Sequence, residues 1–309
     1  MTATESGFAA QAGTEQWPER LGPQAVRLFH GRGDCYPGFE FLTVDYFAPV
    51  LWVVLYKRAV PAVWESIKAQ LRDTLKDHCE VAAVQHRYDR HAPLELLWGE
   101  LPVSPIAREG QLAFQLTLGG RQNPGYFMDM RPARQWLAQR AQGKRILNLF
   151  AYTCAFSVAA MSAGASSVVN IDMSRSAMRQ GRDNHRLNDL DGKEGTTFLG
   201  HDIFRSWGKL RRLGPYDVII CDPPSRQAGS FDAEKDYPRL VRRLSDMLAP
   251  QGSVLACLNA PYLGEAFLRE VLAANAPDLE FVERLPARAD FPDRDPDRAL
   301  KVLHFQRCN

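Results

Sequence analysis

The chain has 309 residues, of which 45% are hydrophobic and 24% are charged, and its formal net charge is +2. This is ordinary globular composition with room for one large domain or two modest ones, and so small a charge does not by itself indicate a polyanionic partner. No apolar run reaches the roughly 18–20 residues of a membrane span, and the first residues lack the features of a signal peptide, so we expect a cytoplasmic protein.

The first part of the chain predicts a small α+β module over residues 21–122, behind a tail over residues 1–20 that is small and polar and is expected to be disordered. Two apolar runs, Phe39–Val44 and Val50–Tyr56, predict a β-hairpin. Apolar residues at helical spacing predict a helix from Pro61 to about Asp77. Further short strands are predicted at Val81–His86, Leu94–Trp98 and Gln111–Leu118.

The segment from Arg145 to Arg175 predicts a βαβ unit that ends on an acidic residue. A strand at Arg145–Phe150, a small-residue helix at Ala155–Ala163 and a strand at Ser167–Ile171 are followed by Asp172. In open parallel sheets the ligand lies beyond the carboxyl ends of the strands, so the first loop and this carboxylate face one cavity. An acid at that position suits the two hydroxyls of a ribose.

The loop between the first strand and the helix narrows the choice of nucleoside ligand. Its sequence NLFAYT, from Asn148 to Thr153, lacks the glycines that close backbone approach to a pyrophosphate requires. A cofactor that carries adenosine without a pyrophosphate tolerates such side chains, and S-adenosylmethionine is one. The unit alone does not decide the matter, because a generic doubly wound domain has the same pattern.

The rest of the chain continues the alternation of strands and helices that a parallel sheet requires. Strands are predicted at Thr196–Leu199, before Asp202, and at Tyr216–Cys221, before Asp222. Upstream, GYFMDMR precedes a helix that starts near Pro132. The remaining predicted elements are helices at Arg175–Leu187, Tyr237–Leu248 and Glu265–Ala274, a turn at Pro250–Gly252, and strands at Val254–Asn259, Glu280–Leu285 and Leu300–Phe305.

With NLFAYT, VNIDMSR and IICDPPS in this order on successive strand ends, the chain resembles class I S-adenosylmethionine-dependent methyltransferases. More narrowly, GYFMDMR, NLFAYT and RLFHGRGDCYPGFEFLTVDYF are similar to the bacterial methyltransferases of 23S ribosomal RNA that act on guanine N7 or cytosine carbon 5. The resemblance spans about Gln24 to Phe305. It implies an α/β fold, with a Rossmann-like seven-stranded sheet and a reversed last strand, over residues 123–309, and S-adenosylmethionine as the cofactor.

The resemblance also implies a set of cofactor-binding residues. The family places the methionine moiety near Tyr126, Phe127, Asp129, Arg131, Asn148, Phe150, Ala151, Tyr152 and Thr153. Asp172 would accept the ribose hydroxyls, Met173 would lie beside the adenine, and Asp202 would accept from the adenine amino group. Asp222 and Pro223 would line the methyl-transfer cavity, and Asp222 is our candidate catalytic residue, because it can orient the target or accept its proton.

The chain departs from the cytosine-modifying branch of the family in two places. It lacks the leading RNA-binding domain of that branch, and Asn259 stands where the branch has its cysteine nucleophile. Cys257 lies two residues earlier on the same strand face, so it is either a displaced nucleophile or a buried core thiol; Cys221 and Cys154 are weaker candidates. The six cysteines show no C-x-x-C spacing, so neither a disulfide framework nor a metal site is indicated.

Features that would bind RNA are less clear in the sequence. The aromatic residue that stacks on the base in amino-group methyltransferases is absent after Asp222-Pro223-Pro224. Phe231 either replaces it or packs in the core. Arg226 either contacts the RNA or is an ordinary loop residue. The basic candidates are Arg211, Arg212, Arg239, Arg242, Arg243, Arg288, Arg294 and Arg298. Because nearby aspartates nearly cancel the last three, RNA as a partner rests mainly on the resemblance.

We therefore predict a methyltransferase that acts on a base of RNA, most specifically 23S ribosomal RNA. One alternative is a methyltransferase of a protein or small molecule, with the N-terminal module as a substrate clamp. A second is a dinucleotide-dependent oxidoreductase, which the missing glycines disfavour. A third is a non-catalytic RNA-binding relative, which the presence of Asp172 and Asp222 disfavours. The acceptor atom and the oligomeric state, a dimer included, stay open.

Overall fold

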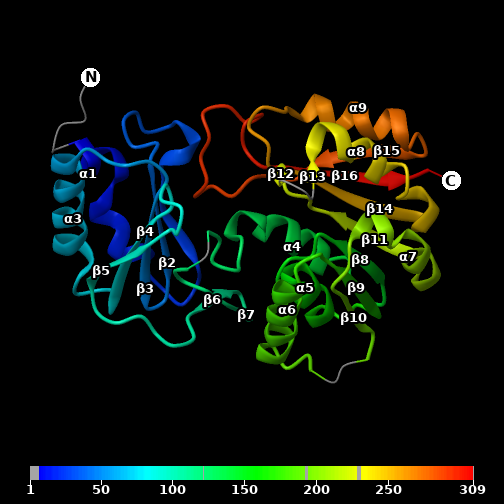
Figure 1. Cartoon of the computed structure of the whole chain (residues 1–309), viewed down its shortest axis with the longest axis horizontal. Helices are drawn as coiled ribbons and strands as arrows, with labels where there is room; N and C mark the ends of the chain where they lie inside the picture. Colours follow the sequence, from blue (N-terminus) through cyan, green and yellow to red (C-terminus); the bar gives the residue numbers. More distant parts are fainter. Residues whose placement is uncertain (1–6, 121, 192–193, 228–230, 309) are drawn as a thin grey trace. The chain divides into compact units, whose positions relative to one another are not determined.

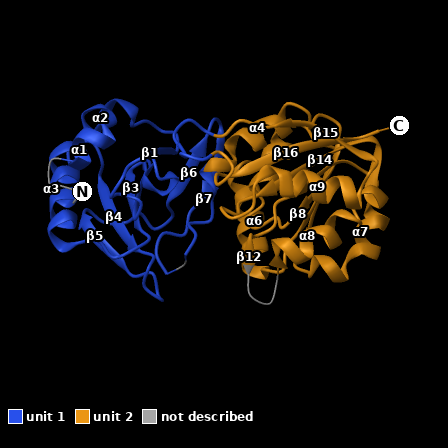
Figure 2. Cartoon of the chain, turned by 90° about the horizontal axis from the view of Figure 1, so that it is seen from above, with its two compact units in different colours: residues 1–128, 288–295 blue, residues 129–287, 296–309 orange. Residues whose placement is uncertain are grey.

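The computed structural model describes residues 7–120, 122–191, 194–227 and 231–308 (Figure 1). They divide into two units, which Figure 2 colours separately. Unit 1 comprises Met1–Met128 with Arg288–Asp295, and unit 2 comprises Asp129–Ala287 with Pro296–Asn309. The sequence predicted one boundary, after residue 122, and a continuous second domain. Instead, a segment from the C-terminal part of the chain belongs to the N-terminal unit.

Unit 1 is built on a sheet with the strand order β1-β2-β3-β4-β5. β2 (Leu42–Phe47) and β3 (Val50–Leu55) form the predicted hairpin, although the turn between them is only Ala48-Pro49. Helix α3 (Pro61–Leu75) joins β3 to the parallel strand β4 (Val81–His86), and it buries apolar residues three or four positions apart against the sheet. The other elements of unit 1 are α1 (Gly7–Ala12), η1 (Thr14–Gln16), α2 (Trp17–Arg20), β1 (Val26–His30), η2 (Gly31–Gly33), β5 (Leu94–Trp98), β6 (Ile106–Glu109) and β7 (Leu112–Gln115).

The prediction of a disordered tail over residues 1–20 is wrong for residues 7–20, while residues 1–6 lie outside the residues that the structure describes. Helices α1 and α2 lie there, and their two large apolar residues, Phe8 and Trp17, are 3% and 1% exposed. The rings of Phe8 and Phe29 are 5.1 Å apart, and the indole nitrogen of Trp17 donates to the carbonyl of Ala12 at 3.1 Å. Two aromatic side chains thus order a stretch whose average composition is polar.

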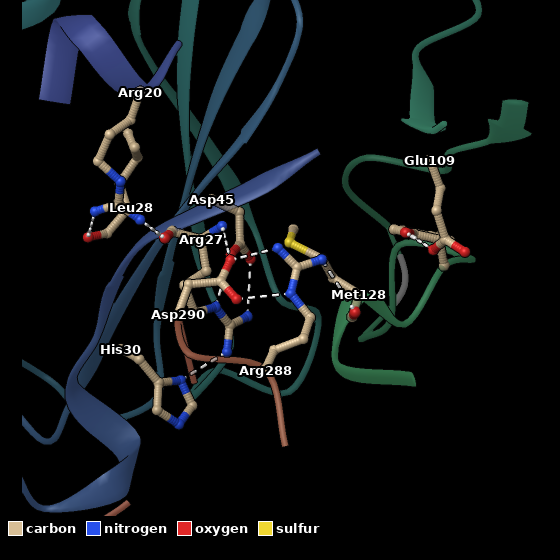
Figure 3. A network of polar contacts seen from close by, with 10 residues as sticks. Arg20, Arg27, Leu28, His30, Asp45, Glu109, Met128, Arg288 and Asp290 are labelled. Atoms are coloured by element: carbon tan, nitrogen blue, oxygen red, sulfur yellow. Dashed lines mark hydrogen bonds and ion pairs between the residues drawn. The ribbon is translucent and has the colours of Figure 1, made fainter. Parts of the chain in front are cut away.

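A partly buried polar network holds the segment Arg288–Asp295 within unit 1 (Figure 3). Arg27 on β1 donates to both carboxylate oxygens of Asp45 on β2, at 2.7 and 2.9 Å, and its backbone N–H donates to Asp290 at 3.0 Å. Arg288 donates to both oxygens of Asp290, at 2.6 and 2.5 Å. Burial raises the pKa of Asp290, but the bonds from Arg288 and from the amide of Arg27 outweigh it, so the net pKa is lowered.

Unit 2 contains a sheet with the strand order β10-β9-β8-β11-β14-β16-β15, seven strands within the described residues. The strands β10, β9, β8, β11 and β14 are parallel, and β16 is antiparallel to both of its neighbours. The predicted Rossmann-like sheet with a reversed last strand is therefore confirmed. None of the described helices combines the length and hydrophobicity that crossing a bilayer requires.

The bounds of the strands are β8 (Arg145–Leu149), β9 (Ser167–Ile171), β10 (Thr196–Leu199), β11 (Tyr216–Cys221), β12 (Arg226–Gln227), β13 (Phe231–Asp232), β14 (Leu248–Leu258), β15 (Leu279–Arg284) and β16 (Lys301–Arg307). The bounds of the helices are η3 (Met128–Met130), α4 (Arg131–Ala138), α5 (Ala155–Ser162), α6 (Arg175–Leu187), η4 (Ile203–Arg205), α7 (Trp207–Leu213), α8 (Ala233–Val241), η5 (Ser245–Met247) and α9 (Glu265–Asn275).

Alternate side chains of the central strands face two different helix layers, as the pleat of a strand requires. Leu147, Ile219 and their counterparts on the same face pack against residues of α7, α8 and α9 in one core cluster. On the other face, Asn170 donates to Ser157 on α5 at 2.9 Å, and Ser157 shares a hydrogen bond with His185 on α6. Helices α5 and α6 therefore cover the face opposite to α7, α8 and α9.

Two element predictions in unit 2 are corrected. The helix expected at Tyr237–Leu248 is α8 (Ala233–Val241), whose first turn is fixed by a hydrogen bond from the amide of Asp232 to Asp236 at 2.9 Å. Pro238 therefore lies inside the helix rather than at its start. The turn expected at Pro250–Gly252 is part of β14, which continues through it with an irregularity in its pairing with β11.

We expect Asp290→Asn to lower the free energy of unfolding by about 2 kcal/mol at pH 7, because the ionised carboxylate accepts from a half-buried arginine and an amide. Since the pKa of Asp290 is lowered, this stabilisation is present above the pKa of the unfolded chain and is lost as the pH falls through the folded-state value. Denaturant unfolding of the two proteins at pH 7 and pH 3 measures the difference, which should shrink at pH 3.

Asp77→Asn is the matched control, since this carboxylate is exposed and lies in the same unit. Equal destabilisation by the two substitutions, or a difference that does not depend on pH, would contradict the assignment of the effect to the Asp290 network.

Candidate active site

Four parallel strands of unit 2 end at the same level. In the pairing register, Leu149 of β8 lies beside Ile171 of β9 and Cys221 of β11, and Ile171 lies beside Leu199 of β10. The residue that follows β9 is Asp172, and the residue that follows β11 is Asp222. Two carboxylates therefore flank the loop that follows β8, at the edge of the sheet where open α/β folds bind ligands.

The loop after β8 has an unusual backbone. Phe150, Tyr152 and Cys154 have φ values of 55°, 45° and 62°, a region that non-glycine residues rarely occupy. The conformation is held by hydrogen bonds from the amide of Ala151 to the carbonyl of Ile171 at 3.0 Å and from the amide of Cys154 to the carbonyl of Ala151 at 2.7 Å. Such strain persists only where neighbouring structure imposes it, and it is common at binding sites.

Asp172 connects this loop to the start of α6. One carboxylate oxygen accepts from the amide of Tyr152 at 2.9 Å, and the other accepts from the amide of Ser174 at 2.8 Å. Burial raises the pKa of Asp172, and these two amides oppose the rise. A carboxylate has about four acceptor positions, so Asp172 is held in place and can still accept from a diol.

Asp222 lies in a more acidic environment. Its pKa is raised to about 7 by burial first and by the charge of Asp129 second, while Arg134 opposes the rise. The sequence analysis named Asp129 and Asp222 separately, and the structure brings them into electrostatic contact. It missed Arg134, which is 2% exposed on α4 and balances the two carboxylates. An arginine between the apolar residues Ala133 and Trp136 was the only available signal.

Asn148, a predicted cofactor residue, lies inside a buried polar chain. Its amide nitrogen donates to Asn170 at 2.8 Å, and Asn170 donates to Ser157, which is hydrogen-bonded to His185. Burial lowers the pKa of His185, so the neutral ring suits this chain. The structure therefore gives Asn148 a role in positioning β8 and β9 below the loop.

Two other predicted residues lie near the ends of β9 and β10. Asp202 caps η4, because its carboxylate accepts from the amide of Phe204 at 2.8 Å, and its other oxygen is 3.5 Å from the Nε of Arg205. Met173 follows Asp172 and is 51% exposed. Ala151, Thr153 and Pro223 are buried, so they contribute shape and backbone rather than exposed side chains.

The predicted residues of GYFMDMR are divided between the units. Tyr126 and Phe127 belong to unit 1, where Tyr126 donates to Glu109 at 2.6 Å and stacks on Phe114 with ring centroids 5.0 Å apart. Phe127 is 39% exposed. Asp129 and Arg131 begin unit 2, at η3 and α4.

The structure decides two questions that the sequence left open. Cys257 is fully buried, and its pKa is raised well above the usual value, first by burial and then by the charge of Asp222, so the reactive thiolate is disfavoured. Phe231 is 2% exposed and packs against Phe150 with ring centroids 5.3 Å apart. Both residues therefore have the core role that was the alternative to a functional one.

Comparisons with known proteins agree with this geometry. The family model described as S-adenosylmethionine-dependent methyltransferase matches residues 26–306. The chain is 30% identical over 299 residues to ribosomal RNA large subunit methyltransferase I of Aeromonas hydrophila subsp. hydrophila, covering 92% of this chain and 74% of that one. It is 36% identical over 158 residues to ribosomal RNA large subunit methyltransferase K/L of Shewanella sp. (strain MR-4), covering 48% of this chain and 22% of that one.

Solved structures show the same likeness. A putative methyltransferase complexed with S-adenosylhomocysteine is 25% identical with a TM-score of 0.85, and the match covers 97% of this chain and 82% of that one. A putative S-adenosylmethionine-dependent methyltransferase from Streptococcus mutans has the same identity and TM-score, and the match covers 97% of this chain and 81% of that one. The M. jannaschii tRNA m1G37 methyltransferase, at 16% identity and a TM-score of 0.60, covering 84% of this chain and 73% of that one, shares the fold.

We expect Asp222→Asn to stabilise the protein at pH 8 but not at pH 4. Because the pKa of Asp222 is raised to about 7, the folded protein keeps a proton that the unfolded chain releases between about pH 4 and pH 7. Stability therefore falls as the pH rises through this range, and the amide removes that loss. Thermal unfolding without added ligand should show a melting temperature a few degrees higher for the variant at pH 8.

The exposed carboxylate of Asp246, changed to Asn, serves as the control and should shift neither melting temperature. A gain for Asp222→Asn that is equal at pH 4 and pH 8 would mean that ionisation of Asp222 is not its cause.

Proposed function

Because the chain belongs to the family of S-adenosylmethionine-dependent methyltransferases, we propose that it transfers the methyl group of this cofactor to a base of RNA, specifically of large-subunit (23S) ribosomal RNA. The acceptor is supported by the relatives that are named ribosomal RNA large subunit methyltransferases, one of which aligns with 92% of this chain. The observation that carries the proposal is the placement of Asp172 and Asp222 on either side of the loop after β8.

S-adenosylmethionine supplies an electrophilic methyl group on a positively charged sulfonium. Asp172 accepts from the ribose hydroxyls, since its carboxylate is already fixed by two amides. Met173 and Asp202, near the ends of β9 and β10, would hold the adenine. Residues Phe150–Thr153 and Asp129 would hold the methionine moiety, with Tyr126, Phe127, Arg131 and Asn148 as further members of the proposed cofactor set. A cluster of carboxylates suits the cationic groups of this cofactor.

Asp222 is the proposed catalytic residue. With a pKa raised to about 7, its carboxyl can act near neutral pH as an acceptor for a proton of the target base, or as a hydrogen-bond partner that orients it. Pro223 shapes the wall beside it. Methyl transfer is an in-line displacement, so alignment and exclusion of water contribute more than acid or base strength. Asp222 is half-buried, which limits the access of water to the reacting groups.

The burial of the cysteines near this edge favours a nitrogen atom of the base as the acceptor. Methylation of cytosine carbon 5 requires a thiolate that attacks the ring first. Cys154, Cys221 and Cys257 are each 0% exposed, and burial raises the pKa of every one of them. A nitrogen nucleophile attacks the methyl group directly and needs no covalent intermediate.

We expect Asp172→Asn to weaken S-adenosylmethionine binding about tenfold to a hundredfold, because the substitution replaces an ionised acceptor with a neutral amide. Isothermal titration calorimetry measures the affinity. Asp183→Asn on the exposed face of α6 is the matched control and should bind like the unaltered protein. Unchanged affinity in Asp172→Asn would exclude this carboxylate from the ribose site.

Incubation with S-adenosylmethionine carrying a labelled methyl group, and with ribosomal RNA from cells that lack the gene, tests the acceptor. We expect label in large-subunit RNA at a base nitrogen, and a loss of at least about tenfold in rate for Asp222→Asn but not for Asp246→Asn. Nuclease digestion and chromatography identify the modified base. Label in protein or in a small molecule, but not in RNA, would overturn the proposed acceptor.

A further inference from the structure

Away from the strand ends, unit 2 contains a cavity of about 570 Å³ that is lined by Phe204, Trp207, Arg239, Arg242 and Arg243. Its walls come from η4, the first residue of α7, and the last turn of α8 with the two residues that follow it. All of them lie in the helix layer opposite to α5 and α6. Cavities of this volume accommodate small ligands or single nucleotides.

The cavity has an excess of positive charge. Arg239 is paired with Asp236 at 2.8 Å, whereas no ion pair is recorded for Arg242 or Arg243 among the residues that the structure describes. The adjoining stretch 203–215 contains four basic residues and no acidic one. These four are Arg205, Lys209, Arg211 and Arg212. Three arginines therefore line the cavity, with one ion pair among them in the part of the chain that the structure describes, although the whole chain carries a net charge of only +2, and such an excess of positive charge suits a polyanion.

Aromatic rings form the rest of the wall. The rings of Phe204 and Trp207 meet edge to face, with centroids 6.0 Å apart and planes at 86°. The guanidinium of Arg239 lies over Phe204, 4.7 Å from the ring centroid. Both aromatic residues are only partly buried. Single-stranded nucleic acids stack their bases on aromatic rings and guanidinium planes, and their phosphates are bound by arginine side chains.

One end of the cavity is connected to the cofactor edge through packed rings. Phe204 follows Asp202 by two residues, and its ring stacks on Phe231 at 6.4 Å, which in turn contacts Phe150 of the loop after β8. Arg242 and Arg243 follow α8, a helix that returns from the carboxyl end of β11 toward the start of β14. At about 1.5 Å per residue, these arginines are about 15 Å along the helix from its start.

We propose that this cavity is a second RNA-binding site, which holds a single-stranded segment of the acceptor RNA beside the segment that carries the methylated base. The inference rests on the proposed function. Arg242 and Arg243 bind phosphodiester groups, and Trp207 presents a surface on which an unpaired base stacks. The site anchors the RNA by its backbone and supplies no base-specific hydrogen bonds, so it contributes affinity and register rather than sequence choice.

The test uses the double variant Arg242→Gln/Arg243→Gln, which keeps the side-chain stems and removes two charges. Binding of a labelled single-stranded fragment of large-subunit RNA, measured by fluorescence anisotropy at several salt concentrations, should be about tenfold weaker, and the slope of log affinity against log salt should fall by about 1.4. Affinity for S-adenosylmethionine and the melting temperature should not change.

The double variant Arg179→Gln/Arg186→Gln is the matched control. It makes the same change in net charge on exposed positions of α6, in the opposite helix layer. We expect its RNA affinity to stay within about twofold of that of the unaltered protein. An equal loss of RNA affinity in the two double variants would mean that net charge alone causes the effect, and the proposed RNA-binding site would then be wrong.

A third variant, Trp207→Leu, tests the stacking surface. Its RNA affinity should fall about fivefold or more with an unchanged salt slope, because stacking releases no counterions. If the unaltered protein methylates RNA but the arginine and tryptophan variants bind RNA normally, the second site is wrong and the proposed function stands. If the unaltered protein binds S-adenosylmethionine but neither binds nor methylates RNA, both are wrong. If the arginine double variant binds ATP or inorganic phosphate more weakly than the unaltered protein but binds RNA normally, the cavity is a site for a free anion and the proposed RNA site is wrong.

Discussion

The alignment of four parallel strand ends is the constraint on which the site depends. Because β10, β9, β8 and β11 end in register, the residues that follow them are brought to one edge although they are distant in sequence. The alignment is maintained from below by the buried chain from Asn148 through Asn170 and Ser157 to His185, which links two strands to two helices. Breaking a buried hydrogen-bonded chain costs free energy, and the chain has one correct arrangement. It therefore holds β8 and β9 in place below a loop whose own backbone is strained.

The carboxylates at this edge are held in opposite ways, and that difference separates their roles. Asp172 receives two backbone amides that keep it in one orientation, whereas Asp222 is half-buried near a second carboxylate and is balanced by Arg134. The first arrangement suits recognition, because its geometry is fixed. The second suits proton transfer or orientation of a target, because its charge state responds to what binds nearby.

The parts of the fold that depend on local patterns were predictable, and those that depend on distant contacts were not. Strands β9, β10 and β11 have the predicted bounds, since short apolar runs ending in polar residues or turns identify parallel strands. Phe8 and Trp17 gave no such signal, because two aromatics in a polar tail become ordered only by packing on a sheet formed elsewhere. Arg134 was not predicted, because its burial depends on packing that the sequence does not show, and the positive φ values of Phe150 and Tyr152 contradict what their residue types favour. Of the predicted cofactor set, which was carried over from resemblance, Asp172 and Asp222 directly follow strands β9 and β11, and their binding of the cofactor stays a prediction.

The segment Arg288–Asp295 means that neither unit is encoded by one continuous stretch of the chain. Chain growth on the ribosome proceeds from the N-terminus, so β1 emerges long before Asp290, the partner of the Arg27 amide. Unit 1 therefore cannot complete its polar network until nearly the whole of unit 2 has been synthesised. A fragment that stops after Met128 would lack the contacts that complete unit 1. Domains that are continuous in sequence can fold one after the other during synthesis. Here, unit 1 cannot finish folding before most of unit 2 has been synthesised.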